Sequence, residues 1–249
     1  MSELLGKQIH KSPKIESLIQ QLVDEVSSVG SNIKSIREPD EALADHAKKL
    51  FDEVAKYRGR PLFYPFLGTG AGHGVYVEVE DGSVKIDLIN GIGIHIFGHS
   101  HPRILKASVR GALSDVVMQG NLEPGSEYAT MGKKLVELAS KKSRLKYAWL
   151  STCGTMANEN ALKMARQKHS PAKMIMAMDH AFAGRSQAMA EITDNPNYRQ
   201  GLPEYREVLR IPFYDANNPK SSEDSLRAMK EHVVLAFSSL RWPDPKPRP

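Results

Sequence analysis

The chain has 249 residues, of which 41% are hydrophobic and 25% charged, a composition ordinary for a globular protein of one large domain or a domain and a half. Its apolar stretches fall short of the roughly 20 residues that cross a membrane, so we expect no membrane span. Cys153 is the only cysteine. An internal disulfide is therefore excluded, and a reducing cytoplasmic location is favoured.

The formal net charge of +5 raises the question of a nucleic-acid partner. Lysine and arginine alternate with acidic residues along most of the predicted helices, and the densest basic stretch is KKSRLKY, residues 141–147. That stretch joins the end of a helix to the start of a strand, where cations complement the helix dipole. The pattern favours a solvated face, and we expect no nucleic-acid partner.

Residues 1–96 are predicted to form an N-terminal lobe of helices and a hairpin. Apolar residues at helical spacing predict one helix from Pro13 and another from about Pro39 to Tyr57. Residues 75–88 alternate apolar and polar side chains on both sides of Asp81-Gly82, a dipeptide that suits a tight turn. This alternation predicts a β-hairpin.

Residues 97–237 have the pattern of an α/β layer with a mainly parallel sheet. The predicted helices are 102–116, 127–141, 156–168 and 222–232, and the predicted strands are 145–150, 173–178, 207–213 and 233–237. Residues 238–249 are predicted to be an irregular tail, because four prolines in the last seven residues suit neither a helix nor a buried strand.

The turn at 151–155 lies between a predicted strand and a predicted helix. Ligands of open parallel sheets bind beyond the carboxyl ends of the strands, and a helix N-terminus attracts anions. Gly154 allows close approach of the backbone, and Thr155 has a hydroxyl that can either cap the helix or meet a ligand. From the turn alone, both an anion site and a simple helix cap remain open.

Several ordered motifs resemble one family. STCGTMANENALKMAR (151–166) resembles the Ser-Gly-Thr-Glu-Ala-Asn-Glu signature of the class III (ω-type) pyridoxal-phosphate aminotransferases. Residues 74–102 resemble that family's entry hairpin and Gly-His-x-His-Pro turn, and residues 178–193 its Phe-His-Gly-Arg-Thr element. The resemblance covers roughly residues 65–237 and points to acetylornithine, ornithine and γ-aminobutyrate aminotransferases.

The resemblance implies a fold-type-I pyridoxal-phosphate transferase, of which this chain would contain the N-terminal lobe and an incomplete large domain. The implied reaction moves an amino group from an ω-amino acid or diamine donor to a 2-oxo acid. The implied cofactor is pyridoxal 5'-phosphate, and the implied assembly is a homodimer.

The resemblance also assigns cofactor-binding residues. Gly154 and Thr155 would hold the cofactor phosphate, together with Cys153, which stands where the family usually has serine. Phe182 would stack on the pyridine ring; the alternative is an ordinary core phenylalanine. Met156 departs from the signature, which has glutamate at this position.

Two substrate-binding residues follow from the same comparison. Arg185 would grip a substrate carboxylate with its planar guanidinium; the alternative is a surface arginine. Ile92 aligns with a gate that is aliphatic in γ-aminobutyrate-type members and aromatic in ornithine-type ones. Ala183 replaces the usual histidine or tryptophan.

No catalytic residue is identifiable. Transamination needs a Schiff-base lysine and a carboxylate on the pyridine nitrogen, and both lie downstream of the segment that 233–237 resembles. We therefore expect a truncated chain that can keep the phosphate-binding and ring-stacking residues but lacks the covalent anchor, and in which the strand 145–150 is left without neighbours. The alternative is a non-catalytic remnant or interaction module.

A metal-dependent hydrolase is a less favoured alternative, suggested by His95, His99 and His101. The aspartate and further histidine that would complete such a site do not follow. The structural interpretation is a turn that ends in a helix cap at Ser100 or His101, with Pro102 in the first helical position. We therefore assign no metal ligand.

Overall fold

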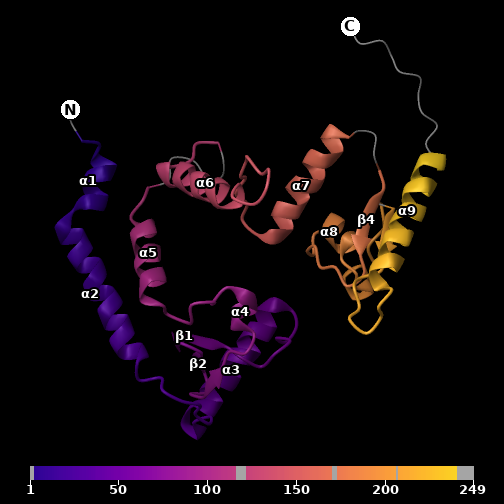
Figure 1. Ribbon diagram of the computed structural model, residues 1–249. Coiled ribbons are helices and arrows are strands. Elements are labelled where there is room, and N and C mark those ends of the chain that lie inside the picture. The colour runs from indigo at the N-terminus through magenta and orange to yellow at the C-terminus, as the bar shows by residue number, and fades with distance from the viewer. Residues whose placement is uncertain (1–2, 116–121, 170–172, 206, 240–249) are drawn as a thin grey trace. The chain divides into compact units, whose positions relative to one another are not determined.

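The computed structural model describes residues 3–115, 122–169, 173–205 and 207–239. The chain divides into two compact units, Met1–Val117 and Met118–Pro249, and each is described by itself (Figure 1). The division at residue 96 into a lobe and a large domain stays a prediction.

The first unit contains five helices and an antiparallel sheet among its described residues. These elements are α1 (Leu5–Lys11), α2 (Pro13–Gly30), α3 (Glu41–Arg58), β1 (Gly68–His73), β2 (Tyr76–Val79), β3 (Val84–Ile86), α4 (Asn90–Gly93) and α5 (Pro102–Ala112). Helix α2 begins where it was predicted, because the Ser12 side chain accepts a hydrogen bond from the Ile15 N–H and Pro13 occupies the first position. Ile19 and Val23 bury one face of this helix.

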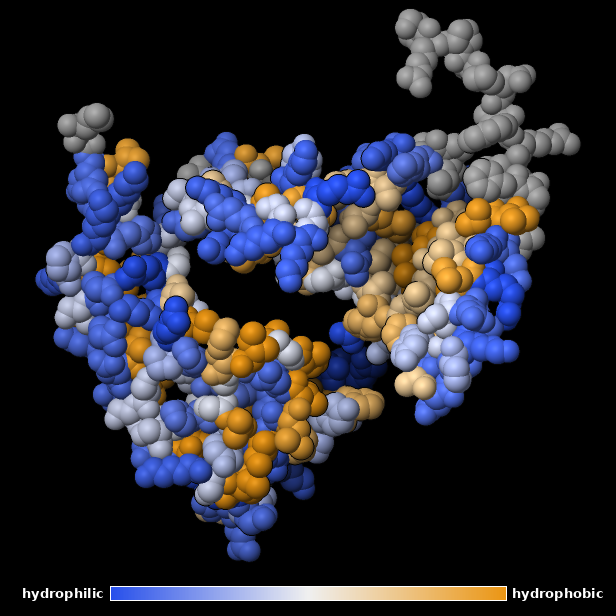
Figure 2. All heavy atoms as spheres, viewed as in Figure 1, coloured by the Kyte–Doolittle hydropathy of each residue, from blue (hydrophilic) through white to orange (hydrophobic). Residues whose placement is uncertain are grey.

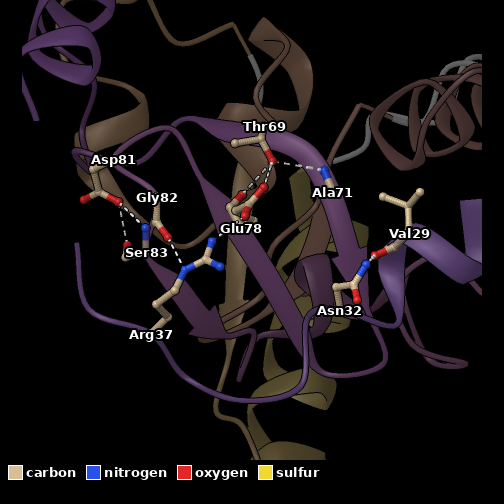
Figure 3. A network of polar contacts seen from close by, with 9 residues as sticks. All are labelled: Val29, Asn32, Arg37, Thr69, Ala71, Glu78, Asp81, Gly82 and Ser83. Carbon is tan, nitrogen blue, oxygen red and sulfur yellow. Dashed lines mark hydrogen bonds and ion pairs between the residues drawn. The ribbon is translucent and has the colours of Figure 1, made fainter. Parts of the chain in front are cut away.

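The predicted hairpin is confirmed by β2 and β3, which pair antiparallel, and β1 adds a third strand in the order β1-β2-β3. The Asp81 carboxylate holds the turn by accepting hydrogen bonds from the Ser83 N–H and hydroxyl, and these bonds lower the pKa of Asp81. Across the sheet, Arg37 donates to the Gly82 carbonyl and forms an ion pair with Glu78 (Figure 3). These contacts tie the segment before α3 to the hairpin.

The second unit contains a short parallel sheet. Its elements are α6 (Ser126–Ala139), α7 (Gly154–Lys168), β4 (Ile175–Met178), α8 (Gln187–Ile192), the 3-10 helix η1 (Pro196–Tyr198), β5 (Val208–Ile211) and α9 (Ser221–Ser239). Strands β4 and β5 pair in parallel from Ile175 opposite Val208 to Met178 opposite Ile211, which confirms the predicted parallel pairing. Met189 and Ala190 of α8 are almost completely buried.

Two predicted strands are wrong. Residues 145–150 form no strand: they belong to no sheet of the described residues, and Tyr147 and Trp149 are 92% and 59% exposed. An extended segment becomes a β-strand only where a neighbouring strand forms hydrogen bonds with its backbone N–H and C=O groups. Residues 233–237 continue α9, because a helix satisfies its own backbone groups and needs no such neighbour.

The remaining differences concern element ends. Helix α5 stops at Ala112, earlier than predicted, and residue 116 lies outside the described residues. Of the predicted irregular tail, residues 238–239 belong to α9 and residues 240–249 lie outside the described residues. Helix α7 begins at Gly154, two residues before the predicted start.

Large apolar side chains lie on the surface of both units (Figure 2). In the first unit, one short segment contains six of them, Leu88, Ile89, Ile92, Ile94, Ile96 and Phe97, each at least 64% exposed. Among the described residues, no helix has both the length and the apolarity needed to cross a membrane.

Candidate active site

The N-terminus of α7 has no side-chain cap: its N-cap residue accepts no hydrogen bond from the first N–H groups of the helix. Cys153 is the N-cap residue and is extended (φ −161°, ψ 170°), but its side chain accepts no hydrogen bond from the helix. The Ala157 N–H donates to the Cys153 carbonyl (3.0 Å), so the N–H groups of residues 154–156 precede the first helical bond. The first turn also contains no acidic residue. The tip therefore offers N–H donors and the positive end of the helix dipole to an anion.

Two glycines define the space around this tip. A Cβ built on Gly154 meets no atom within 4 Å, so the backbone there is open to a ligand. A Cβ built on Gly184 would lie 2.4 Å from Thr155 Oγ1. The segment 182–186 therefore lies directly against Thr155, and the two motifs that resemble the family's cofactor site meet in one place.

Phe182 is not a core residue, because 64% of its surface is exposed. Its ring contacts Tyr198 edge to face, with the centroids 6.0 Å apart and the planes at 71°. The two rings therefore meet edge to face, and the exposed part of Phe182 leaves aromatic surface available for stacking.

Arg185 follows Gly184 and is exposed. Within the part of the chain that the structure describes, its guanidinium forms no ion pair with an acidic side chain. A guanidinium without an ion pair is chemically suited to hold an anionic group, such as a carboxylate.

Ile92 lies in the other compact unit and is described there alone. It is 87% exposed and has φ +60° within α4, where Asn90, Gly91 and Gly93 also have positive φ. A β-branched residue disfavours this left-handed conformation, so the segment must be held by its surroundings.

Asp87 supplies that hold. Its carboxylate accepts hydrogen bonds from the Ile89 N–H (3.1 Å), the Gly91 N–H (2.7 Å) and His99 Nε2 (2.9 Å). The His99 hydrogen bond is the largest cause of a lowered Asp87 pKa. Asp87 was not singled out from the sequence, because nothing in the sequence indicates that its two oxygens turn back on the following residues.

The histidines are engaged within the fold. His99 bonds to Asp87, the His95 ring stacks on the His99 ring at 4.0 Å, and His101 Nδ1 accepts from the Arg103 N–H (3.3 Å). The predicted helix cap therefore falls on His101. Among the described residues, no three histidine, cysteine, aspartate or glutamate side chains come together to hold a metal, so the metal-hydrolase alternative gains no support.

A shallow hollow of about 380 Å³ adjoins the same turn. It is lined by Tyr128, Trp149, Leu150, Ser151, Thr152, Met156 and Asn160. Phe182 and Arg185 are not among the lining residues, so the hollow and the predicted ring position are separate features.

The comparisons with known proteins identify the family. The profile of the aminotransferase class-III family matches residues 64–241. The chain belongs to this family. The resemblance to this family stated above is thereby confirmed.

The relatives extend well beyond the matched part. A Pyrococcus horikoshii protein, provisionally named LysW-aminoadipate semialdehyde/glutamate semialdehyde transaminase, is 34% identical over 152 residues, which cover 61% of this chain and 40% of that protein. Bacillus anthracis acetylornithine aminotransferase is 30% identical over 145 residues, 58% of this chain and 36% of that one. The chain thus spans about two fifths of the length of these curated relatives.

Solved transaminases share the fold. An (S)-enantioselective omega-transaminase from Thermomicrobium roseum superimposes with a TM-score of 0.67 at 19% identity, over 77% of this chain and 47% of that one. An amine transaminase from an uncultivated Pseudomonas species, solved in its PLP-bound form, gives a TM-score of 0.60 at 18% identity, over 68% of this chain and 41% of that one. The predicted fold-type-I class is confirmed.

Proposed function

We propose that this chain contributes the phosphate-binding and ring-binding part of a pyridoxal-phosphate aminotransferase. The observation that carries the proposal is the uncapped tip of α7 with the segment 182–186 packed against Thr155. The reaction proposed for the whole protein is transfer of an amino group from an ω-amino acid or diamine donor to a 2-oxo acid. When bound, the cofactor supplies an electron sink for that chemistry.

The tip of α7 fits a phosphate dianion. The N–H groups at Gly154 and Thr155 face no side-chain acceptor of their own helix, and the open space at Gly154 permits close approach. The Thr155 hydroxyl adds a donor, and the Cys153 thiol adds a weaker one. The absence of an acidic residue from the first turn avoids repulsion of the dianion.

Phe182 and Arg185 extend the site away from the phosphate. Phe182 is exposed and contacts Tyr198 edge to face, and an exposed aromatic ring suits stacking on a flat pyridine ring. Arg185 would bind and orient a substrate carboxylate through paired N–H donors. No lysine of this chain is assigned to the Schiff base.

Two further parts of the proposal depend on the family alone. Ile92 would form an aliphatic wall that favours ω-amino acid donors, and a second copy of the protein would complete a homodimer. The single cysteine supports a cytoplasmic location.

The test is a titration of the purified 249-residue chain with pyridoxal 5'-phosphate, followed by calorimetry. We expect Thr155→Val to weaken binding at least about tenfold, because a hydrogen bond to a charged group is lost. Thr155→Ser retains the hydroxyl and should remain within about threefold of the wild type. A wild-type chain that binds no cofactor would contradict the proposal and favour a non-catalytic interaction module.

A further inference from the structure

One face of α7 is joined to the segment 182–186 by side-chain hydrogen bonds. Asn158 Nδ2 donates to the Ala183 carbonyl (2.8 Å), and the Ser186 hydroxyl donates to Glu159 Oε1 (2.6 Å). Asn158 and Glu159 lie within the first two turns of the helix, close to the tip. These bonds therefore attach the segment to the helix close to the proposed phosphate position.

Thr193 holds the same segment from behind. Its side chain is 1% exposed, and its hydroxyl oxygen accepts from the Ala183 N–H (2.9 Å) and the Gly184 N–H (3.2 Å). The same hydroxyl donates to the Gly184 carbonyl (3.0 Å). One buried side chain thus satisfies three backbone groups of a turn that would otherwise carry unpaired polar atoms.

The contact between Gly184 and Thr155 further restricts the position of the segment 182–186 relative to the tip of α7. Gly184 has φ +138°, and an added Cβ would lie 2.4 to 2.9 Å from three Thr155 side-chain atoms. The backbone of the segment consequently sits as close to the helix tip as a residue without a side chain permits.

We propose that Asn158, Glu159 and Thr193 are positioning residues that fix the separation between the helix tip and the exposed side chains of Phe182 and Arg185. The inference rests on the proposed function and deepens it. The three residues act through the backbone and hydroxyl groups of residues 183–186, and none of them is proposed to touch the cofactor.

The fixed separation should raise the affinity only of a ligand that binds at two points. Pyridoxal 5'-phosphate would engage the α7 tip through its phosphate and Phe182 through its ring. The second contact is effectively intramolecular only if the two points are held at the right distance. Loosening the segment therefore costs affinity for the whole cofactor. Inorganic phosphate has no ring, so we expect its binding at the tip to depend little on the position of Phe182.

The experiment compares these two ligands on the full chain. Binding of pyridoxal 5'-phosphate is measured by calorimetry, and binding of inorganic phosphate by its ³¹P chemical shift. Asn158→Ala and Thr193→Val remove hydrogen bonds of the segment. Thr193→Ser restores the hydroxyl, Glu159→Gln retains a carbonyl acceptor for Ser186, and Gln167→Ala alters an exposed side chain on the same helix.

We expect Asn158→Ala and Thr193→Val to weaken cofactor binding about tenfold while phosphate binding changes less than about twofold. Thr193→Ser, Glu159→Gln and Gln167→Ala should resemble the wild type for both ligands. Because Thr193 is buried, Asn158→Ala on the exposed surface keeps the test informative if Thr193→Val does not fold.

Three results would overturn the inference. Equal weakening of both ligands, with a lower melting midpoint, would show a purely structural role. Unchanged cofactor affinity in Asn158→Ala and Thr193→Val would show that the separation is set elsewhere. In both cases the wild type still binds the cofactor and the proposed function stands, whereas a wild type that binds neither ligand overturns the proposed function as well.

Discussion

Two segments of this protein each precede a helix, and they differ in whether side chains accept hydrogen bonds from their backbone N–H groups. In residues 87–101, Asp87 accepts two backbone N–H groups and bonds to His99, and His101 caps α5. In residues 151–155, Cys153 stands at the N-cap of α7 without a cap bond. The first turn is satisfied by its own side chains, and the second leaves donors for a ligand.

The difference shows why chemistry-bearing residue types alone are a poor guide to a site. The histidine-rich turn looks reactive in sequence, but its polar groups are used within the fold. The turn at 151–155 contains few reactive residue types, but the helix that follows it has no side-chain cap. Gly184, with φ +138°, lies against Thr155 at this helix tip. Unused polar groups, rather than polar residues as such, mark the candidate site.

The largest effect is expected at the contact that distinguishes the second turn. Gly184→Ala would place a Cβ 2.4 Å from Thr155 Oγ1 at a φ that side chains disfavour, so we expect the free energy of unfolding to fall by about 2–3 kcal/mol. Gly154→Ala is the matched control, because its Cβ meets nothing within 4 Å and should change stability by less than about 1 kcal/mol. Urea unfolding measures both, and equal effects would refute the close contact.

A smaller effect is expected if the second turn is made to resemble the first. Cys153→Asp supplies the missing cap, which should stabilise the chain by about 1 kcal/mol. The same carboxylate occupies the N–H groups and repels a phosphate, so we expect affinity for pyridoxal 5'-phosphate to fall about tenfold. Calorimetry and thermal unfolding give the two quantities.

The control for that substitution lies in the first turn. His101→Ala removes the cap of α5 and should lower stability by about 0.5–1 kcal/mol with no change in cofactor affinity. Cofactor binding by Cys153→Asp at wild-type strength would mean that the α7 tip is not where the phosphate binds.

The smallest effect is expected from acid titration of the first turn. Hydrogen bonds lower the folded-state pKa of Asp87 below its unfolded value, so its contribution to stability is present above the unfolded pKa and is lost as pH falls through the folded one. The stability difference between wild type and Asp87→Asn should therefore be larger at pH 7 than at pH 3. Denaturant unfolding at both values checks this, and a difference that grows on acidification would exclude the assigned role.

Local patterns were sufficient for much of the fold. The hairpin at 75–88 follows from alternation around Asp81-Gly82, and α2 follows from helical spacing with Pro13 at its start. The parallel direction of β4 and β5 follows from the alternation of helices and short apolar runs. In each case the information lies within a few residues or within one supersecondary unit.

The failures have a common cause. Residues 145–150 and 233–237 have strand-like composition, but a strand requires a neighbour, and neither segment belongs to a sheet of the described chain. Apolar runs of this length do not distinguish a strand from a helix without that neighbour. The motif residues Cys153, Gly154, Thr155, Phe182 and Arg185 were identified through a family resemblance, and their roles stay predictions.

The sequence by itself determined the family, the main helices, the hairpin and the two segments that form the candidate site, because those features depend on local order along the chain. Only the tertiary structure decided that Gly184 lies against Thr155, that Thr193 supports this turn from within, and that the histidines bond within their own turn. Such contacts depend on how the folded backbone brings each polar group to its partner, which the order of residue types does not specify.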